Sequence, residues 1–264
     1  MPADAGHSGQ LDPDEPAHRG RRERGDATEF HYLSVLRSHT ALFAGCLLDA
    51  EADGRAALAL HCVDDTREIP PAAAVLIETP VDRGLTDEAQ TILTARDLEG
   101  DRSISMLIDH FVLLARGRLR MRQRRYREAL NDFGKCGEQL VTAGYVNPAF
   151  AHWRSEAVLA HLALGDTGAA LALATENLEL ARRYAAPHGL GVALRVMGQA
   201  TGDIRTAIDL LEESVAVLAE SCADLDRVRS LIEYGAALRW AGKRNQSMEP
   251  LRQGLDLANR CGAE

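Results

Sequence analysis

The amino-acid sequence predicts an all-helical protein, a right-handed α-solenoid of about six antiparallel helical hairpins. Leu and Ala dominate and aromatic residues make up 5% of the chain, so residue propensities favour helix over strand. Between residues 115 and 144, a polar turn separates two arms whose apolar residues, such as Ala129 and Phe133, fall on one helical face. The frame of this stretch then recurs, with Ala170 in the place of Ala129, 170−129=41 positions on.

Residues 1–27 contain few apolar side chains to offset the entropy of ordering, and we expect them to form a disordered tail. A basic run from His18 to Arg24 within this tail has two interpretations. It is an arm for a polyanion, or a solvated segment balanced by the acidic residues around it, and those neighbours favour the second interpretation. The helical repeat domain is expected over residues 28–264.

Residues that start or stop helices divide the repeat domain into hairpins. Pro70 and Pro71 end the linker after the first hairpin, because proline stops a helix behind it and can begin one in front. Pro80 predicts a kink or an early stop in the second hairpin, and Thr86 is a candidate cap for its second arm. The third hairpin is the stretch that sets the repeat frame. These three hairpins are expected over residues 29–62, 72–98 and 105–144.

The last three hairpins carry similar signals. Asp166 and Asp203 precede the second arms of the fourth and fifth hairpins, where a side-chain oxygen can accept a hydrogen bond from a free backbone N–H. Pro250 fits the final helix if that helix begins near Ser247, and it marks a kink if the start is nearer Arg244. The hairpins are expected over residues 147–185, 189–219 and 224–262.

Glycines inside the predicted helices indicate close packing. Gly117, Gly198 and Gly235 each lie in a first arm, where a missing side chain lets the two arms of a hairpin approach. Gly134 and Gly137 lie in a second arm, and each costs about 1 kcal/mol relative to Ala. We therefore expect a close helix contact at both of these positions.

Composition excludes several classes of function. The formal net charge of −9 gives no general attraction to nucleic acid or anionic lipid. The first residues lack the apolar core of a signal peptide, and no apolar run approaches the roughly 18 residues of a membrane span. Five cysteines without a CxxC pair fit buried, reduced thiols in an intracellular protein, so we expect a cytoplasmic location.

Three positions of the repeat frame resemble the tetratricopeptide repeat (TPR). The repeat period runs from 235−198=37 to 41 residues, longer than the usual length of about 34. The frame departs from the pattern at Ala174, which is small for its position, and at Ser247, where alanine is expected. The matching residues are a small residue in the first arm (Gly117, Gly235), an alanine early in the second (Ala129, Ala170, Ala207) and a larger apolar residue four positions on (Phe133, Leu211).

Longer phrases between residues 45 and 264 extend the resemblance. LLARGRLRM, NPAFAHWRSEAVLAHLALGD and YGAALRWAGKRNQSMEPLRQGLDLANRCGA are similar to the TPR sensor region of the large ATP-binding LuxR-type (LAL, maltose-activator-like) transcriptional regulators of actinobacteria. In those regulators an NTPase domain precedes the repeats and a helix-turn-helix domain follows them. The sequence has no GxxxxGK[ST] phosphate loop. The resemblance therefore implies a sensor role, without NTPase or helix-turn-helix domain in this chain.

The concave groove of the solenoid is the expected site for a protein partner or a small-molecule effector. Seven arginines lie between residues 116 and 127, and a solvated face with a charged turn is the default interpretation. In the functional interpretation, Arg118 and Arg122 line the groove and pair with an acidic partner or phosphate. Repeat register adds positions in three further first arms. The candidate groove residues are Arg118, Arg122, His152, Ser155, Glu156, Arg195, Gln199, Arg229 and Glu233.

Catalytic patterns are missing from the sequence. Nine histidines include no HExxH motif, and Cys136 lies on an apolar helical face as a core residue does. We therefore expect no enzymatic activity, no cofactor and no metal site.

Two functions remain open. The leading hypothesis is a non-catalytic effector- or partner-binding module of a LuxR-type transcriptional regulator. The alternative is a free-standing TPR scaffold or adaptor that joins two proteins, and self-association is compatible with both. The acidic chain is expected to bind DNA only weakly and without sequence specificity, and to bind no membrane.

Overall fold

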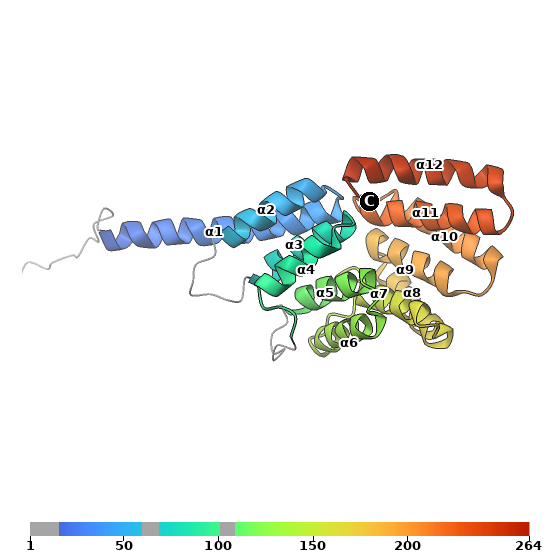
Figure 1. Cartoon of the computed structure of the whole chain (residues 1–264), viewed down its shortest axis with the longest axis horizontal. Helices are drawn as coiled ribbons and strands as arrows, with labels where there is room; N and C mark the ends of the chain where they lie inside the picture. Colours follow the sequence, from blue (N-terminus) through green and yellow to red (C-terminus); the bar gives the residue numbers. More distant parts are fainter. Residues whose placement is uncertain (1–15, 60–68, 101–108, 264) are drawn as a thin grey trace, which may run out of the picture.

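The computed structural model describes residues 16–59, 69–100 and 109–263, shown in Figure 1. All regular elements within these ranges are α-helices, which confirms the all-helical prediction. In chain order the helices are α1 (Pro16–Phe43), α2 (Leu47–Ala59), α3 (Ile69–Asp82), α4 (Thr86–Ala95), α5 (His110–Arg122), α6 (Tyr126–Thr142), α7 (Trp153–Ala163), α8 (Thr167–Tyr184), α9 (Pro187–Ala200), α10 (Ile204–Leu218), α11 (Asp224–Trp240) and α12 (Arg244–Cys261).

Consecutive helices pair into six antiparallel hairpins, α1 with α2 through α11 with α12, and each hairpin packs against the next (Figure 1). The result is an α-solenoid. Residues 16–27, which the sequence analysis assigns to a disordered tail, belong to helix α1. Extending an existing helix fixes one residue per new hydrogen bond, and the Ala, Arg and Glu residues here are good helix formers. The rest of that tail, residues 1–15, lies outside the described residues.

Helix caps agree with the sequence at two of three positions. Asp166 accepts a hydrogen bond from the Ala169 N–H at 3.1 Å, and Asp203 accepts one from the Thr206 N–H at 2.9 Å. The expectation for Thr86 is wrong, because this residue is already inside helix α4 and the preceding residue makes no side-chain cap. A threonine one position too late cannot reach the free N–H groups of the first turn.

The two helix-interior prolines have different effects. Helix α3 ends at Asp82, two residues beyond Pro80, as expected for an early stop. Helix α12 begins at Arg244, so Pro250 lies well inside it and leaves one backbone carbonyl of the preceding turn without its usual partner.

Close helix contacts explain all but one of the glycines discussed above. A Cβ at Gly117 would overlap the buried ring of Phe133, and a Cβ at Gly137 would lie 2.7 Å from the ring of Trp153. Gly198 and Gly235 likewise face side chains of the paired helix. The expectation fails for Gly134, because nothing lies within 4 Å of a Cβ built there.

The first and last hairpins of the array meet, as the blue and red helices of Figure 1 show near the C-terminus. Leu42 and Leu47 share one hydrophobic cluster with Leu225 of α11 and Cys261 of α12. The open, curved groove expected from the sequence is therefore narrowed, because residues at its two ends contact one another. Within the described residues no helix is long and apolar enough to cross a membrane.

The glycine contacts predict opposite effects of one substitution at two sites. Gly117→Ala should lower the free energy of unfolding by about 1–3 kcal/mol, because the Phe133 ring is fully buried and cannot move aside. Gly134→Ala should raise it by up to about 1 kcal/mol, since helix propensity improves and no clash follows. Urea unfolding followed by circular dichroism measures both, and equal effects at the two sites would contradict the packing described here.

Candidate functional site

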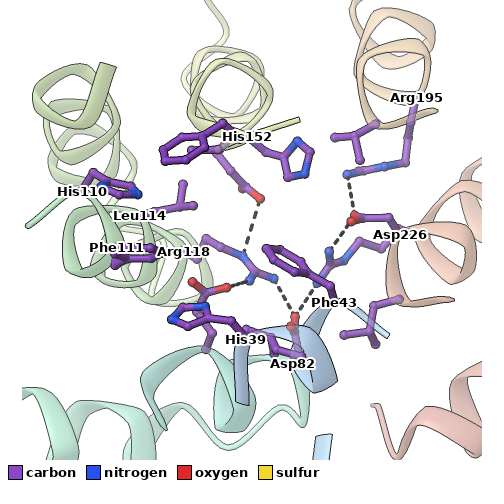
Figure 2. Close-up of a pocket in the computed structure, with 18 residues that line it drawn as sticks. His39, Phe43, Asp82, His110, Phe111, Leu114, Arg118, His152, Arg195 and Asp226 are labelled. Atoms are coloured by element: carbon purple, nitrogen blue, oxygen red, sulfur yellow. Dashed lines mark hydrogen bonds and ion pairs between the residues drawn. The ribbon is translucent and has the colours of Figure 1, made fainter. Parts of the chain in front are cut away.

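Two adjoining cavities lie where helices α3, α5, α7, α9 and α11 face one another. The smaller one, here the aromatic chamber, has a volume of about 70 Å³ and is shown in Figure 2. The larger one, here the wide chamber, has a volume of about 540 Å³, within the range of small-molecule binding sites. Six residues with aromatic side chains line the aromatic chamber: His39, Phe43, His110, Phe111, Phe150 and His152. Apolar and charged side chains line the wide chamber, among them Met121, Arg122, Leu159, Ile232 and Glu233.

Charged side chains separate the two chambers. Asp82, at the end of α3, accepts hydrogen bonds from Arg118 Nη2 of α5 at 2.7 Å and from Arg229 Nη2 of α11 at 2.5 Å. Arg118 also pairs with Glu78, and its Nε lies 3.5 Å from Glu156 Oε1 of α7. We call this network, with its extension around Asp226, the charged partition: Glu78, Asp82, Arg118, Glu156, Arg195, Asp226 and Arg229.

Asp226, in the first turn of α11, is the second centre of the charged partition. Its Oδ1 accepts a hydrogen bond from Arg229 Nη1 at 2.8 Å and lies 3.5 Å from Arg195 Nη2. Its Oδ2 lies 2.8 Å from His188 Nε2. The first turn of a helix favours a carboxylate there, because free N–H groups and the helix dipole both stabilise negative charge.

Burial and ion pairing compete in setting the charge of these groups. Burial opposes ionisation of Asp82, but Arg118 and Arg229 outweigh it and hold the pKa of Asp82 below its ordinary value. Arg229 and His188 outweigh burial in the same way at Asp226, whose pKa lies well below the ordinary value. Burial prevails at Glu78, whose pKa is raised even though Arg118 pairs with it. Asp82 and Asp226 therefore remain ionised to lower pH than ordinary aspartates do.

Arg195 is the least satisfied cation of the charged partition. Its side chain is 6% exposed, and its Nε is buried without a hydrogen-bond partner. Burial lowers the pKa of Arg195, and Asp226 at 3.5 Å offsets this only in part. Arg195 lines both chambers, so an anionic group entering either one could reach it.

Two histidines that line the aromatic chamber, His152 and His39, have lowered pKa values and are neutral near pH 7. Burial lowers the pKa of His152 to about 3, and neither of its two buried ring nitrogens has a hydrogen-bond partner. The ring of His152 lies edge-on to that of His188, with 4.4 Å between centroids. Burial lowers the pKa of His39 to about 4, and His39 Nε2 lies 3.1 Å from the carbonyl oxygen of Pro71.

The structure brings most of the candidate groove residues together. Ser155 is not among them: it is buried between α7 and α8, where its hydroxyl accepts a hydrogen bond from Asn177 Nδ2 at 3.0 Å. Gln199 is half-buried and lines neither chamber. Whether any of them binds a partner stays a prediction. The residues that line one or both chambers are Arg118, Arg122, His152, Glu156, Arg195, Arg229 and Glu233.

The site also depends on four residues that are not among the candidates predicted from the sequence. Repeat register could have found His188 and Asp226, because they follow His152 at spacings of 188−152=36 and 226−188=38 residues, close to the repeat period. No local signal marks Glu78 and Asp82, which enter the site only because α3 packs against α5 and meets α11.

The arginine run from 116 to 127 is less solvated than its default interpretation states. Arg116 is 2% exposed and binds the carboxylate of Asp132 with Nε at 3.0 Å and Nη2 at 2.6 Å. Arg120 donates to the same carboxylate at 2.6 Å. Helical spacing therefore sends Arg116 and Arg120 toward α6 and Arg118 toward the chambers. Only the run's remaining members, Arg122 at the end of α5, Arg124 and Arg125 at the turn and Arg127 on α6, are exposed as expected.

Cysteine burial matches the expectation in part. Cys136 and Cys261 are buried, whereas Cys46 and Cys222 are exposed, and all four are free thiols. Burial raises the pKa of Cys136 to about 12, so its thiol is un-ionised near pH 7. Cys62 lies outside the described residues.

The structure is similar to solved repeat proteins at low sequence identity. A signal transduction ATPase with numerous domains from Pyrococcus horikoshii, which has a tetratricopeptide repeat sensor, aligns with a TM-score of 0.59 and 15% identity, over 94% of this chain and 38% of that one. NprR in complex with its cognate peptide NprX aligns with a TM-score of 0.53 and 16% identity, over 85% of this chain and 67% of that one. BtubC from P. vanneervenii aligns with a TM-score of 0.53 and 15% identity, over 83% of this chain and 90% of that one.

These similarities support a TPR-like solenoid fold, and at such low sequence identity they indicate the fold only. No profile of a known protein family matches the chain. No curated protein matches it either.

Removing a charge from the partition should destabilise the fold. Arg118→Gln leaves the buried carboxylate of Asp82 with one arginine, and we expect the free energy of unfolding to fall by about 3 kcal/mol, the lower limit for a broken buried pair. Arg125→Gln is the matched control. It breaks an exposed pair with Glu128 and should change stability by less than about 0.5 kcal/mol. Similar losses in the two variants, measured by urea unfolding, would show that the partition does not stabilise the fold.

The depressed pKa of His39 predicts acid sensitivity. The unfolded chain binds a proton at this residue near pH 6.5, whereas the folded chain resists it down to about pH 4. The contribution to stability is complete above pH 6.5 and is lost as the pH falls toward 4. His39→Phe should therefore lose less stability than the unmodified protein between pH 6.5 and 5, measured by thermal unfolding. Parallel pH profiles would refute the assignment.

Proposed function

We propose that this chain is the effector-binding module of a LuxR-type transcriptional regulator and that the wide chamber holds the effector. The observation that carries the proposal is a cavity of about 540 Å³, bounded by buried charges that join the first half of the solenoid to its last hairpin. The tetratricopeptide repeat sensor of the P. horikoshii ATPase and peptide-bound NprR support a sensor role for this fold. The sequence resemblance to LuxR-type sensor regions supplies the regulatory context.

The chamber favours an effector with one anionic group and an apolar body. Arg195, with its unpartnered Nε, and exposed Arg122 supply positive charge, while Met121, Leu159 and Ile232 supply apolar wall. A short peptide with a free C-terminal carboxylate has this combination, because charge-assisted hydrogen bonds to arginine fix the carboxylate and side chains bury against the wall.

Binding would change the shape of the array through the partition. An anion that pairs with Arg195 competes with Asp226, and Asp226 shares Arg229 with Asp82. The pair between Arg229 and Asp82 joins α11 to α3. An effector that binds more tightly when this pair is broken shifts the population toward an array whose two ends are apart. Neighbouring domains would respond to this change in the shape of the array.

The proposal includes no catalytic step. Cys136, the buried cysteine of the central hairpin, is an un-ionised thiol that donates to the carbonyl of His110 at 3.7 Å. The carboxylates of the partition are paired with arginines, which suits structural anions better than proton transfer. We keep the cytoplasm as the expected location, because a regulator of transcription acts there.

Calorimetric titration tests the site with a pool of short peptides that have free C-termini and the same pool with amidated C-termini. We expect binding of the free-carboxylate pool only, weakened about tenfold or more by Arg195→Gln. Arg205→Gln, on exposed surface of α10, is the matched control and should leave the affinity unchanged. Equal binding of both pools, or equal loss in both variants, would contradict the proposal.

A free-standing scaffold is the second candidate, and helix α1 favours it. Phe30, Tyr32 and Leu33 are 52%, 57% and 63% exposed there, an unusual display of large apolar side chains on one helix. The DNA that flanks the coding region separates the two candidates. In-frame sequence for an NTPase or helix-turn-helix domain favours the regulator, and unrelated flanking genes favour the scaffold.

A further inference from the structure

Three metal-ligating side chains converge beside the aromatic chamber. His152 directly precedes α7, His188 lies in the first turn of α9, and Asp226 lies in the first turn of α11. Their ligand atoms all lie within 4.8 Å of one another. Because the three residues lie at or next to the start of the first helix in successive hairpins, the repeat itself brings them together.

His152 is the member of this group whose chemistry is otherwise unused. Both of its ring nitrogens are buried, and neither has a hydrogen-bond partner. A buried polar nitrogen left without a partner costs about 1–3 kcal/mol. Packing against the ring of His188 at 4.4 Å does not satisfy these nitrogens, whereas coordination of a metal ion would satisfy one of them.

We propose that His152, His188 and Asp226 form a binding site for a divalent transition-metal ion such as Zn²⁺. Two imidazoles and one carboxylate are a ligand set that zinc and related ions favour. His188 Nε2 and Asp226 Oδ2 are 2.8 Å apart, and tetrahedral bonds of about 2.0–2.2 Å to one ion would place them roughly 3.4 Å apart. Side-chain movements of less than about 1 Å would therefore bring these two atoms to the separation that coordination of one ion requires.

The surrounding charges both orient and limit the site. Arg229 and Arg195 hold Oδ1 of Asp226, and Oδ2 lies 2.8 Å from His188 Nε2 on the side of the two imidazoles. Partners behind a metal ligand commonly orient it in this way. The same two arginines repel a cation, and the carboxylates of Asp82 and Asp226, which both pair with Arg229, offset part of this repulsion. The open coordination positions would face the aromatic chamber, which His152 and Asp226 line. Water or an effector atom would complete the coordination there.

This inference does not depend on the proposed function. Metal binding depends on His152, His188 and Asp226, whereas peptide binding depends on Arg195 and a free carboxylate. Peptide binding can fail while the metal site stands, and the reverse also holds. The sequence alone predicts no metal site, because the nine histidines include no HExxH motif.

The test is a titration of the full chain, with any affinity tag removed, using Co²⁺ followed by absorbance and Zn²⁺ followed by calorimetry. We expect one tight equivalent and a tetrahedral Co²⁺ spectrum. His152→Ala and His188→Ala should each weaken binding by about tenfold or more. His161→Ala is the matched control, because His161 Nδ1 lies 3.4 Å from Asp166 Oδ2 but this pair belongs to no group of three metal-ligating side chains among the described residues.

Unchanged affinity in the His161 variant, with loss in the other two, supports the site. Binding that survives His152→Ala and His188→Ala would place the ion elsewhere on the chain and overturn the proposal, as would no binding at all. Circular dichroism verifies that each variant folds. If His152→Ala does not fold, His152→Phe fills the same space without a ligand atom and should show the same loss.

Discussion

The carboxylate of Asp82 is the constraint on which the rest of the structure depends. It is 4% exposed, and its charge is supported by Arg118 from α5 and Arg229 from α11. Taking a carboxylate out of water is unfavourable unless cations and hydrogen-bond donors replace the lost hydration. The pair with Arg229 bridges residues 147 positions apart, so the charge requirement of one side chain ties the second hairpin to the last. A solenoid without such a pair would be free to vary its curvature.

Closing the array in this way changes what its inner face can hold. An open groove presents separate, hydrated side chains, whereas the described chambers place charged groups where water is scarce and electrostatic interactions are stronger. Arg195 shows the consequence: with Asp226 at 3.5 Å and an unpartnered Nε, it is positioned for a further anion. The hydrophobic cluster that contains Leu42, Leu47 and Leu225 also holds the first and last hairpins together, but apolar packing does not fix how the two hairpins align. Ion pairs add the geometric specificity that apolar contacts lack.

The repeat also explains why functional side chains accumulate at one rim. First-turn positions of α5, α7, α9 and α11 lie near the cavities, and His110, His152, His188 and Asp226 are at or next to those positions. Each hairpin contributes one polar side chain to a shared space, so a site forms from residues that are about one repeat apart. His152 is neutral at this rim, because burial lowers its pKa to about 3. TPR-like arrays can build binding sites by this route without a contiguous motif.

Local sequence signals determined the helices, two of their caps and the packing within hairpins. Apolar spacing placed Ala129 and Phe133 on the buried face of α6, Asp166 and Asp203 capped their helices, and Gly117 marked the approach of α5 to α6. Those features depend on residues within about one repeat of one another, which is why pattern and spacing suffice. The tertiary structure alone decided that the array closes, that Asp82 meets Arg229, and that Ser155 faces Asn177 instead of the cavity. The curvature of the array is the sum of small rotations between successive hairpins, so it cannot be predicted from any short stretch of sequence.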